Sequence, residues 1–265
     1  MTIKDFFSTT GMDEHPTNYL FGSFHLLYFL IFIISFILIF KLVKSMKKEK
    51  QDRFINLALI LIIVLKYATE ILFIYEYYTL DEPLSSYSHP FLNVNTFFSF
   101  QLCGVMNIVL PLVIWFDIKP LKPFVYLTSI LGGLAVVFYP VTVLYGDPLQ
   151  INLPMFRSII VHFFLVLIPL VLISRDDILI KKKDSISLTI GIFSVAAWAM
   201  FGNLFIDKTA NNMYLMDNPF KIAQIPVLGD IPDGYHVFVL AVMVFIGYFI
   251  VYNIARIFQK KPRNF

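Results

Sequence analysis

The chain has 265 residues, of which 58% are hydrophobic and 15% are charged, and its mean hydropathy is +0.76. Soluble proteins contain roughly 45–50% apolar and about 25% charged residues, so this composition excludes a water-soluble domain. The net charge of +3 does not indicate nucleic-acid binding, because the Lys and Arg residues fall in short blocks between apolar runs rather than in one patch. We therefore expect a membrane protein without a nucleic-acid partner.

Apolar runs of about 20 residues recur along the whole chain, and each is long enough to cross a hydrocarbon layer of about 30 Å. They predict an all-α, polytopic membrane protein with one domain over residues 1–265 and about seven transmembrane helices. The predicted spans cover about 20–43, 54–78, 97–116, 124–145, 157–174, 185–206 and 235–258.

The basic residues are distributed unevenly between the two sides of these spans. One side holds those of the connections after the first, third and fifth spans and of the C-terminal segment, at 41–53, 119–122, 175–183 and 256–263. The other side holds only Lys4, Arg157, Lys208 and Lys221. Since basic residues are retained on the cytoplasmic side, we expect the N-terminus outside and the C-terminus in the cytoplasm.

Five spans then carry a polar or ionisable residue in their outer halves, at His25, Glu70, Cys103, His162 and Asn203. Such residues are costly in a bilayer and by default mark a site or a pathway. Cys103 is expected about six residues, or roughly 9 Å, inside the third span. These positions predict a pocket that opens in the outer leaflet.

Spacing along the third span adds detail to this pocket. Ser99, Cys103 and Asn107 are four residues apart and are expected to share one helical face, while Gln101 projects from nearly the opposite side. On the fifth span, Ser158 and His162 share a face in the same way.

Cys103 is the only cysteine, so it cannot form an intramolecular disulfide. A thiol in apolar surroundings is a poor nucleophile, and a position deep in a helix gains little from the helix dipole, so Cys103 needs a neighbouring base. His162 is the best candidate because its predicted depth matches. Asn203, Asn107 or Glu70 could orient the imidazole or donate to an oxyanion, and spacing alone selects none of them.

Structural roles explain the same residues. Cys103 could simply pack, and His162 could make an interhelical hydrogen bond. Lys66 and Glu70, four apart on the second span, are expected to form an internal ion pair, with a proton or ligand role as the rival. His236, at the rim, is expected to be solvated. No metal site is expected, because no two histidines share a helix at ligand spacing.

The segment Asn211–Tyr214, sequence Asn-Asn-Met-Tyr, lies in the longest connection, roughly residues 207–234. It is polar and aromatic and is followed by three prolines. Two interpretations remain open: an ordered lid or re-entrant turn that includes Asn212 and Tyr214, or an ordinary exposed proline-rich loop.

Four features carry a resemblance to a known family. They are Phe21-Gly22-Ser23-Phe24-His25, Phe100-Gln101-Leu102-Cys103, His162, and the Asn-Asn-Met-Tyr segment, which is similar to an Asn-Tyr-Met pattern in altered order. The chain resembles YwaF-type bacterial integral membrane proteins and, more distantly, the animal transmembrane protein 164 group. The resemblance implies acyl transfer on membrane phospholipids in a bacterial cell membrane, with Cys103 as nucleophile and His162 as base.

We therefore expect a phospholipid acyltransferase or acyl hydrolase that forms a Cys103 thioester, uses phospholipids or lysophospholipids and needs no cofactor. The residues expected to bind substrate or support the site are His25, Glu70, Gln101, Asn107, Asn203, Asn212 and Tyr214. The alternative is a membrane carrier or lipid-binding protein for a small polar or amphiphilic ligand, without catalysis. A polar path past Lys66 to the cytoplasm would favour that alternative, and a third interpretation is a scaffold with interhelical polar contacts only. The sequence leaves the oligomeric state open.

Overall fold

The computed structural model describes residues 6–7, 21–79, 98–140, 143–144, 149, 151–222 and 225–259. These residues are helical or irregular, and no strand lies among them. Six helical segments are long and apolar enough to cross a membrane: Ser23–Ser45, Lys48–Glu76, Lys119–Phe138, Leu153–Ser174, Ser185–Ile206 and His236–Phe258. The protein is therefore a multi-pass, all-helical integral membrane protein. Long Leu, Ile, Val and Phe runs form helices in lipid because a helix satisfies its own backbone hydrogen bonds.

The long helices are α2 (Ser23–Ser45), α3 (Lys48–Thr79), α4 (Leu102–Trp115), α5 (Lys122–Phe138), α6 (Leu153–Ser174), α7 (Ser185–Phe201) and α9 (His236–Phe258). The short elements are the 3-10 helices η3 (Lys119–Leu121), η5 (Lys182–Asp184) and η7 (Asn212–Tyr214), the π-helix η6 (Gly202–Ile206) and the helix α8 (Pro219–Ile222).

The third predicted span, α4, is shorter than the sequence suggested. It has 14 residues instead of the run 97–116, and at about 1.5 Å per residue it is roughly 21 Å long. Ser99 has a φ of 58°, so the chain is left-handed there and α4 begins only at Leu102. The predicted stripe therefore loses Ser99, although Cys103 and Asn107 remain one turn apart. The seventh span and the placement of the N-terminus outside stay predictions.

Further helix boundaries differ from the predicted spans, and α3, for example, begins at Lys48 instead of residue 54. The fourth predicted span ran to residue 145, but α5 ends at Phe138, because Pro140 disfavours a helical conformation at Tyr139. The fifth was expected to begin at residue 157, yet α6 begins at Leu153. The Asn152 side chain caps it by accepting the Met155 N–H at 3.0 Å.

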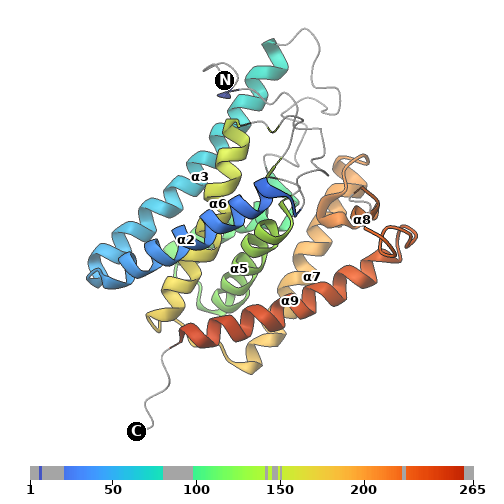
Figure 1. The fold of residues 1–265 in the computed structure, drawn as a ribbon. Helices are drawn as coiled ribbons and strands as arrows, with labels where there is room; N and C mark the ends of the chain where they lie inside the picture. Colours follow the sequence, from blue (N-terminus) through green and yellow to red (C-terminus); the bar gives the residue numbers. More distant parts are fainter. Residues whose placement is uncertain are drawn as a thin grey trace.

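The core of the bundle is formed by α5 and α6. In their most apolar stretches, 67% and 72% of the residues are buried, against 11–39% in the other spans. Figure 1 shows α5 and α6 in the middle of the molecule, with α2 and α3 on one side and α7 and α9 on the other. The exposed Leu, Ile and Phe side chains of the outer helices, such as Leu30 of α2 and Phe249 of α9, are the surface that lipid covers.

Two adjacent glycines let the neighbours of α5 approach closely. A Cβ on Gly133 would stand 2.8 Å from the His162 carbonyl oxygen and 2.6 Å from a Val166 methyl group, both on α6. A Cβ on Gly132 would stand 3.0 Å from the Sγ of Cys103, on α4. Small residues at such contacts let helix backbones pack together in membranes. The glycine pair thus brings Cys103 and the His162 backbone to one level of α5.

Side-chain hydrogen bonds define the two ends of the bundle. At one end, which we call the long-loop end because it carries residues 207–235, His25 of α2 reaches the Val137 carbonyl of α5. At the other, which we call the cleft end, Arg175 after α6 binds Asp52 of α3. Because the helix directions are fixed by these contacts, His25, Glu70, Cys103, His162 and Asn203 all lie toward the long-loop end.

Gly133→Ala is expected to destabilise the protein by about 1–3 kcal/mol, because the new Cβ would overlap the α6 backbone. The neighbouring Gly132→Ala is the matched control: it meets only the tip of the Cys103 side chain, which can rotate. Thermal unfolding of the detergent-solubilised variants should give the lower midpoint for Gly133→Ala. Equal midpoints would contradict the assigned packing.

Candidate functional site

The three described histidines differ in how their ring nitrogens are used. His25 accepts a hydrogen bond from the Phe21 N–H at Nδ1 (3.0 Å) and donates from Nε2 to the Val137 carbonyl (3.0 Å). Val137 is in the last turn of α5, where carbonyls lack helical partners. Both nitrogens of His25 are therefore occupied in joining α2 to α5, and its predicted support of a site remains a prediction.

His236 is used in the same way, and the expectation that it is solvated is wrong. Its side chain is fully buried. Nδ1 accepts from the Gly234 N–H at 3.2 Å, and Nε2 donates to the Tyr214 carbonyl at 2.8 Å. The sequence missed this role because the residue lies at the start of its predicted span, a position that pattern analysis assigns to the interface, and it is the first residue of α9.

His162 keeps one ring nitrogen available. Its Nδ1 lies 2.7 Å from the Ser158 carbonyl oxygen and 3.2 Å from the Ser158 hydroxyl, so Nδ1 carries the proton that is donated to the carbonyl. Within the described part of the chain, all hydrogen bonds of His162 run through Nδ1. In the neutral ring, Nε2 therefore presents its lone pair, which is the tautomer a general base requires.

Cys103 lies in the first turn of α4, directly after Leu102. The expectation that it stands too deep in its helix to feel the dipole is therefore wrong, because the chain breaks at Ser99. The positive end of the α4 dipole favours a thiolate here, while burial favours the neutral thiol. The half-buried side chain packs against a small apolar cluster that includes Val136 and Met155, and Ile159 of α6 packs against the same cluster. No hydrogen bond joins Cys103 to His162 among the described residues.

The Asn-Asn-Met-Tyr segment is ordered and docks on the helices beside Cys103. Asn203, in the π-helix η6, accepts at Oδ1 from the Asn212 N–H (2.9 Å) and Nδ2 (2.8 Å), and its own Nδ2 donates to the Asn212 carbonyl (3.2 Å). Gln101, the N-cap residue of α4, accepts from the Met213 N–H at 2.9 Å. The structure thus brings together four of the predicted residues, Gln101, Cys103, Asn203 and Asn212, through one docked turn. The hydrogen-bonded pair of Asn203 and Asn212 is here named the asparagine clasp.

This docking holds a strained turn. Met213 and Tyr214 have φ values of 53° and 56°, and each such residue costs about 1–2 kcal/mol when it is not glycine. Strain of this kind persists only where the surroundings over-determine it, and here the asparagine clasp, Gln101 and His236 do so. The turn leaves the Tyr214 side chain half-buried, within electrostatic range of Cys103 and Tyr139. Burial, and then the neighbouring Tyr139 and Cys103, raise the pKa of Tyr214 to about 12.

Glu70 lies apart from this cluster and pairs with Lys66 on α3. The ammonium and carboxylate are 3.4 Å apart, with only 2% and 8% of the side chains exposed, so the predicted internal ion pair is confirmed. Arg157 of α6 lies within electrostatic range of both Lys66 and His162. A ligand or proton role for Glu70 stays a prediction.

Asn107 lies one turn below Cys103 on α4 and is buried. Its Oδ1 has no hydrogen-bond partner among the described residues. An unsatisfied buried acceptor costs roughly 1–3 kcal/mol, so this oxygen is available to a polar group of a bound molecule.

An apolar band separates the long-loop end from the cleft end. Below Lys66, Asn107 and His162, the buried positions of α3, α4 and α6 are hydrocarbon: Leu59, Ile62, Leu110, Val113, Leu165 and Ile168. On α5 the Thr128 hydroxyl is bonded to Tyr248 of α9 (2.6 Å), and Ser129 is isolated. The described helices therefore show no continuous polar path past Lys66, which favours a one-sided site over a carrier.

Two further residues shape the site, and the sequence analysis missed both. Trp198 of α7 stacks on Phe100 (ring centroids 4.7 Å apart) and donates to the Ser99 carbonyl at 3.1 Å, which fixes the break before α4. Gly202 leaves room for the same Phe100 ring. Their only sequence signal was an aromatic and a glycine near a span end, which is common in membrane helices.

The family model of the TMEM164 family matches residues 20–252. The chain belongs to the TMEM164 family. The resemblance to the animal transmembrane protein 164 group is thereby confirmed, and the YwaF-type assignment stays a prediction. Comparisons with curated proteins and with solved structures gave no match. Membership of the TMEM164 family is consistent, in a general way, with a membrane acyltransferase-type role.

In this TMEM164 family member, Asn203→Ala should loosen the docked turn. The change removes the Asn203 Oδ1 acceptor of the Asn212 N–H and Nδ2, a loss of about 1–3 kcal/mol that corresponds to amide exchange that is roughly 5- to 100-fold faster. Hydrogen-exchange mass spectrometry of peptides from 207–222 measures it. Asn203→Asp, which keeps the acceptor, should retain most of the protection, and the exposed Asn253→Ala is the control. Unchanged exchange in Asn203→Ala would contradict the clasp.

The phenol of Tyr214 should titrate about two pH units above an exposed tyrosine. The difference in phenolate absorbance between wild type and Tyr214→Phe is expected to rise near pH 12 rather than near 10, because burial disfavours the phenolate. Since the folded pKa is raised, the stability linked to Tyr214 is fully present below about pH 10 and is lost as the pH rises toward 12. A difference that saturates by pH 10.5 would show an exposed ring.

Proposed function

We propose that this TMEM164 family protein is a phospholipid acyltransferase or acyl hydrolase that acts at the long-loop end through a thioester on Cys103. The observation that carries the proposal is the state of the three described histidines. In His25 and His236 both ring nitrogens are hydrogen-bonded to backbone groups, whereas His162 is fixed through Nδ1 and keeps Nε2 as an acceptor. Family membership supports the acyl-transfer chemistry.

The first half-reaction uses Cys103 and His162. His162 Nε2 takes the proton of the thiol, and the thiolate attacks the carbonyl carbon of a lipid ester. The ester C–O bond then breaks, the leaving lysolipid oxygen takes the proton back from His162, and the acyl group remains on Cys103 as a thioester. Water or the hydroxyl of a second lysolipid, deprotonated by His162, resolves this thioester in the same manner. No diffusible cofactor enters either step.

Tyr214 and the α4 dipole suit the charge that develops during attack. Tyr214 stays protonated at neutral pH and lies half-buried within electrostatic range of Cys103, so its hydroxyl can donate to an oxyanion. Asn107, one turn below, leaves its Oδ1 without a partner among the described residues, and this acceptor suits a hydroxyl of the lipid rather than the oxyanion. The first-turn position of Cys103 adds the α4 dipole to the same charge.

The experiment is an acylation assay on the purified protein in mixed micelles with phospholipids of defined acyl chains. Intact-protein mass spectrometry is expected to detect one acyl adduct, on Cys103, that neutral hydroxylamine removes. Cys103→Ser and His162→Ala should each lower turnover by a hundredfold or more, since general-base catalysis alone is worth about 10²–10⁴. The exposed Ser194→Ala on α7 is the control and should keep wild-type turnover.

Two results would overturn the proposal. One is full lipid-remodelling activity in Cys103→Ser. The other is a wild-type protein that is folded by thermal unfolding but shows neither turnover nor an acyl adduct across a panel of phospholipids and lysophospholipids. The second result, together with saturable lipid binding, would establish the non-catalytic lipid-binding alternative.

A further inference from the structure

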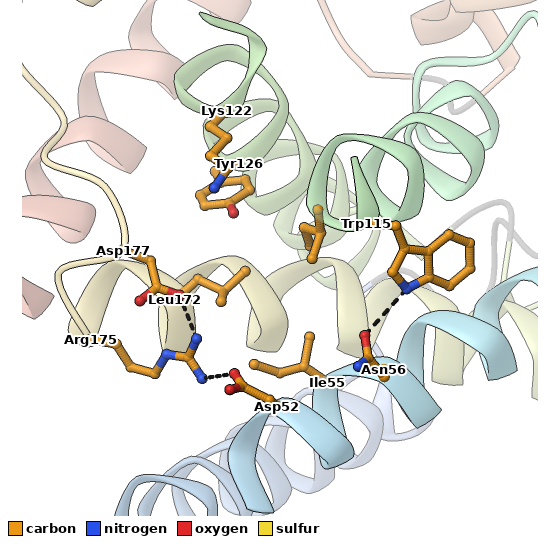
Figure 2. Close-up of a pocket in the computed structure, with 10 residues that line it drawn as sticks. Asp52, Ile55, Asn56, Trp115, Lys122, Tyr126, Leu172, Arg175 and Asp177 are labelled. Atoms are coloured by element: carbon orange, nitrogen blue, oxygen red, sulfur yellow. Dashed lines mark hydrogen bonds and ion pairs between the residues drawn. The ribbon is translucent and has the colours of Figure 1, made fainter. Parts of the chain in front are cut away.

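A second polar site lies at the cleft end of the bundle. It is an open cleft of about 360 Å³ between α3, α4, α5 and the end of α6, within the size range of small-molecule sites. Figure 2 shows its lining, with Arg175 and Asp177 on one side, Trp115 and Asn56 on the other, and Ile55 and Leu172 between them. Charged groups, an aromatic ring and an apolar floor thus meet in one hollow.

This cleft is distinct from the region around Cys103. Trp115 lies twelve residues after Cys103 on α4, and Arg175 lies thirteen residues after His162 at the end of α6. At about 1.5 Å per residue, these separations correspond to roughly 18–20 Å along the helices. The apolar band described above fills that distance. A lipid whose polar part occupies the cleft therefore belongs to the opposite leaflet from one whose ester reaches Cys103.

The position of the cleft is that of a lipid headgroup. It is formed by the last turns of α4 and α6 and the first turns of α3 and α5, so it lies where these helices leave the apolar layer. Trp115, 44% exposed, stands at a span end, the depth at which tryptophan rings anchor at the membrane interface. The floor of Ile55, Ile114 and Leu172 is suited to the glycerol and first methylenes of a lipid rather than to a fully water-soluble ligand.

The charges of the cleft are balanced and paired with one another. Arg175 donates to Asp52 at 2.6 Å and to Asp177 at 2.5 Å. Lys122 binds Asp117, and this ammonium holds the pKa of the Asp117 carboxyl below its usual range. An anion alone would have to displace a carboxylate and leave that carboxylate unpaired, which is costly. A ligand that carries both an anionic and a cationic group compensates both partners.

The aromatic side of the cleft is suited to the cationic half of such a ligand. The Trp115 indole N–H donates to the Asn56 Oδ1 at 3.3 Å, which orients the ring. The face of an indole is the best aromatic surface for an ammonium group. The basic side, with Arg175 and Lys122, suits a phosphate.

From this arrangement we propose that the cleft lined by Arg175, Lys122, Asp52 and Trp115 binds the headgroup of a zwitterionic phospholipid, one with both a phosphate and an ammonium, in the leaflet opposite to Cys103. The phosphate lies against Lys122 and Arg175, and the ammonium lies against Trp115 and the carboxylate that the phosphate releases. This site does not depend on the chemistry proposed for Cys103, and it is tested by binding alone.

The chain has only two tryptophans, Trp115 in the cleft and Trp198 at the long-loop end, so Trp115 fluorescence reports on the site directly. The protein is purified in full length in dodecyl maltoside, and the difference signal between wild type and Trp115→Phe is followed while lipid is added as a mole fraction of the micelle. Phosphatidylethanolamine and phosphatidylcholine are expected to give a saturable change. Phosphatidylglycerol and diacylglycerol should require at least tenfold higher mole fractions.

Two variants and one control connect the signal to the cleft. Lys122→Gln and Arg175→Gln should each weaken the binding of the zwitterionic lipids about tenfold or more. Because Arg175 also makes two ion pairs, Lys122→Gln is the variant that remains informative if Arg175→Gln unfolds. Lys119→Gln removes an exposed ammonium that lies outside the cleft and should bind as wild type does.

The proposal is overturned by any of three results: equal response to phosphatidylglycerol, an unsaturable change that survives Lys122→Gln, or binding of free phosphoethanolamine as tight as that of the lipid. The last result would assign the cleft to a soluble zwitterion instead of a membrane lipid. Activity at Cys103 plays no part in these readouts, so a failed acyl-transfer assay leaves the inference standing, and the reverse also holds.

Discussion

The close approach of α6 to Gly133 of α5 is the constraint on which the rest of the bundle depends. In a membrane, apolar surface gains nothing by leaving lipid, so helices associate through close packing. A bare Cα at Gly133 lets the His162 carbonyl lie against α5, and the adjacent Gly132 admits the Cys103 side chain from α4. These contacts align α4, α5 and α6 at one level, and this alignment sets the positions of the polar residues at the long-loop end.

At the long-loop end, irregular backbone near the membrane needs hydrogen-bond partners. Side chains supply them: His25 takes an orphan carbonyl of α5, His236 takes the carbonyl of Tyr214, and Asn203 and Gln101 take N–H groups of the docked turn. Of the polar residues that the sequence assigned to a site, His25, Gln101 and Asn203 thus bind backbone groups and Glu70 pairs with Lys66. Among the described residues, His162 keeps one ring nitrogen and Asn107 keeps its Oδ1 without a partner.

Hydropathy was sufficient to predict the helical class and the six spans found here, because long apolar runs have one solution in lipid. It could not predict the break at Ser99, which depends on Trp198 stacking on Phe100 from a distant helix. The four-residue spacing on the second span correctly predicted the ion pair of Lys66 with Glu70. The hydrogen-bond partners of ring nitrogens depend on the tertiary structure, so the sequence could not distinguish His25 and His236 from His162. For the same reason it did not predict the cleft beside Arg175.

The apolar band between the two ends also isolates them electrically. In the described helices, Thr128 of this band is bonded to Tyr248 and Ser129 stands alone, so these hydroxyls form no chain that could conduct a proton. Protons that enter or leave His162 must then exchange with the water on its own side. Chemistry at Cys103 would accordingly depend on the pH of a single compartment. Most of a proton gradient across the membrane would lie across the apolar band rather than across the reacting groups.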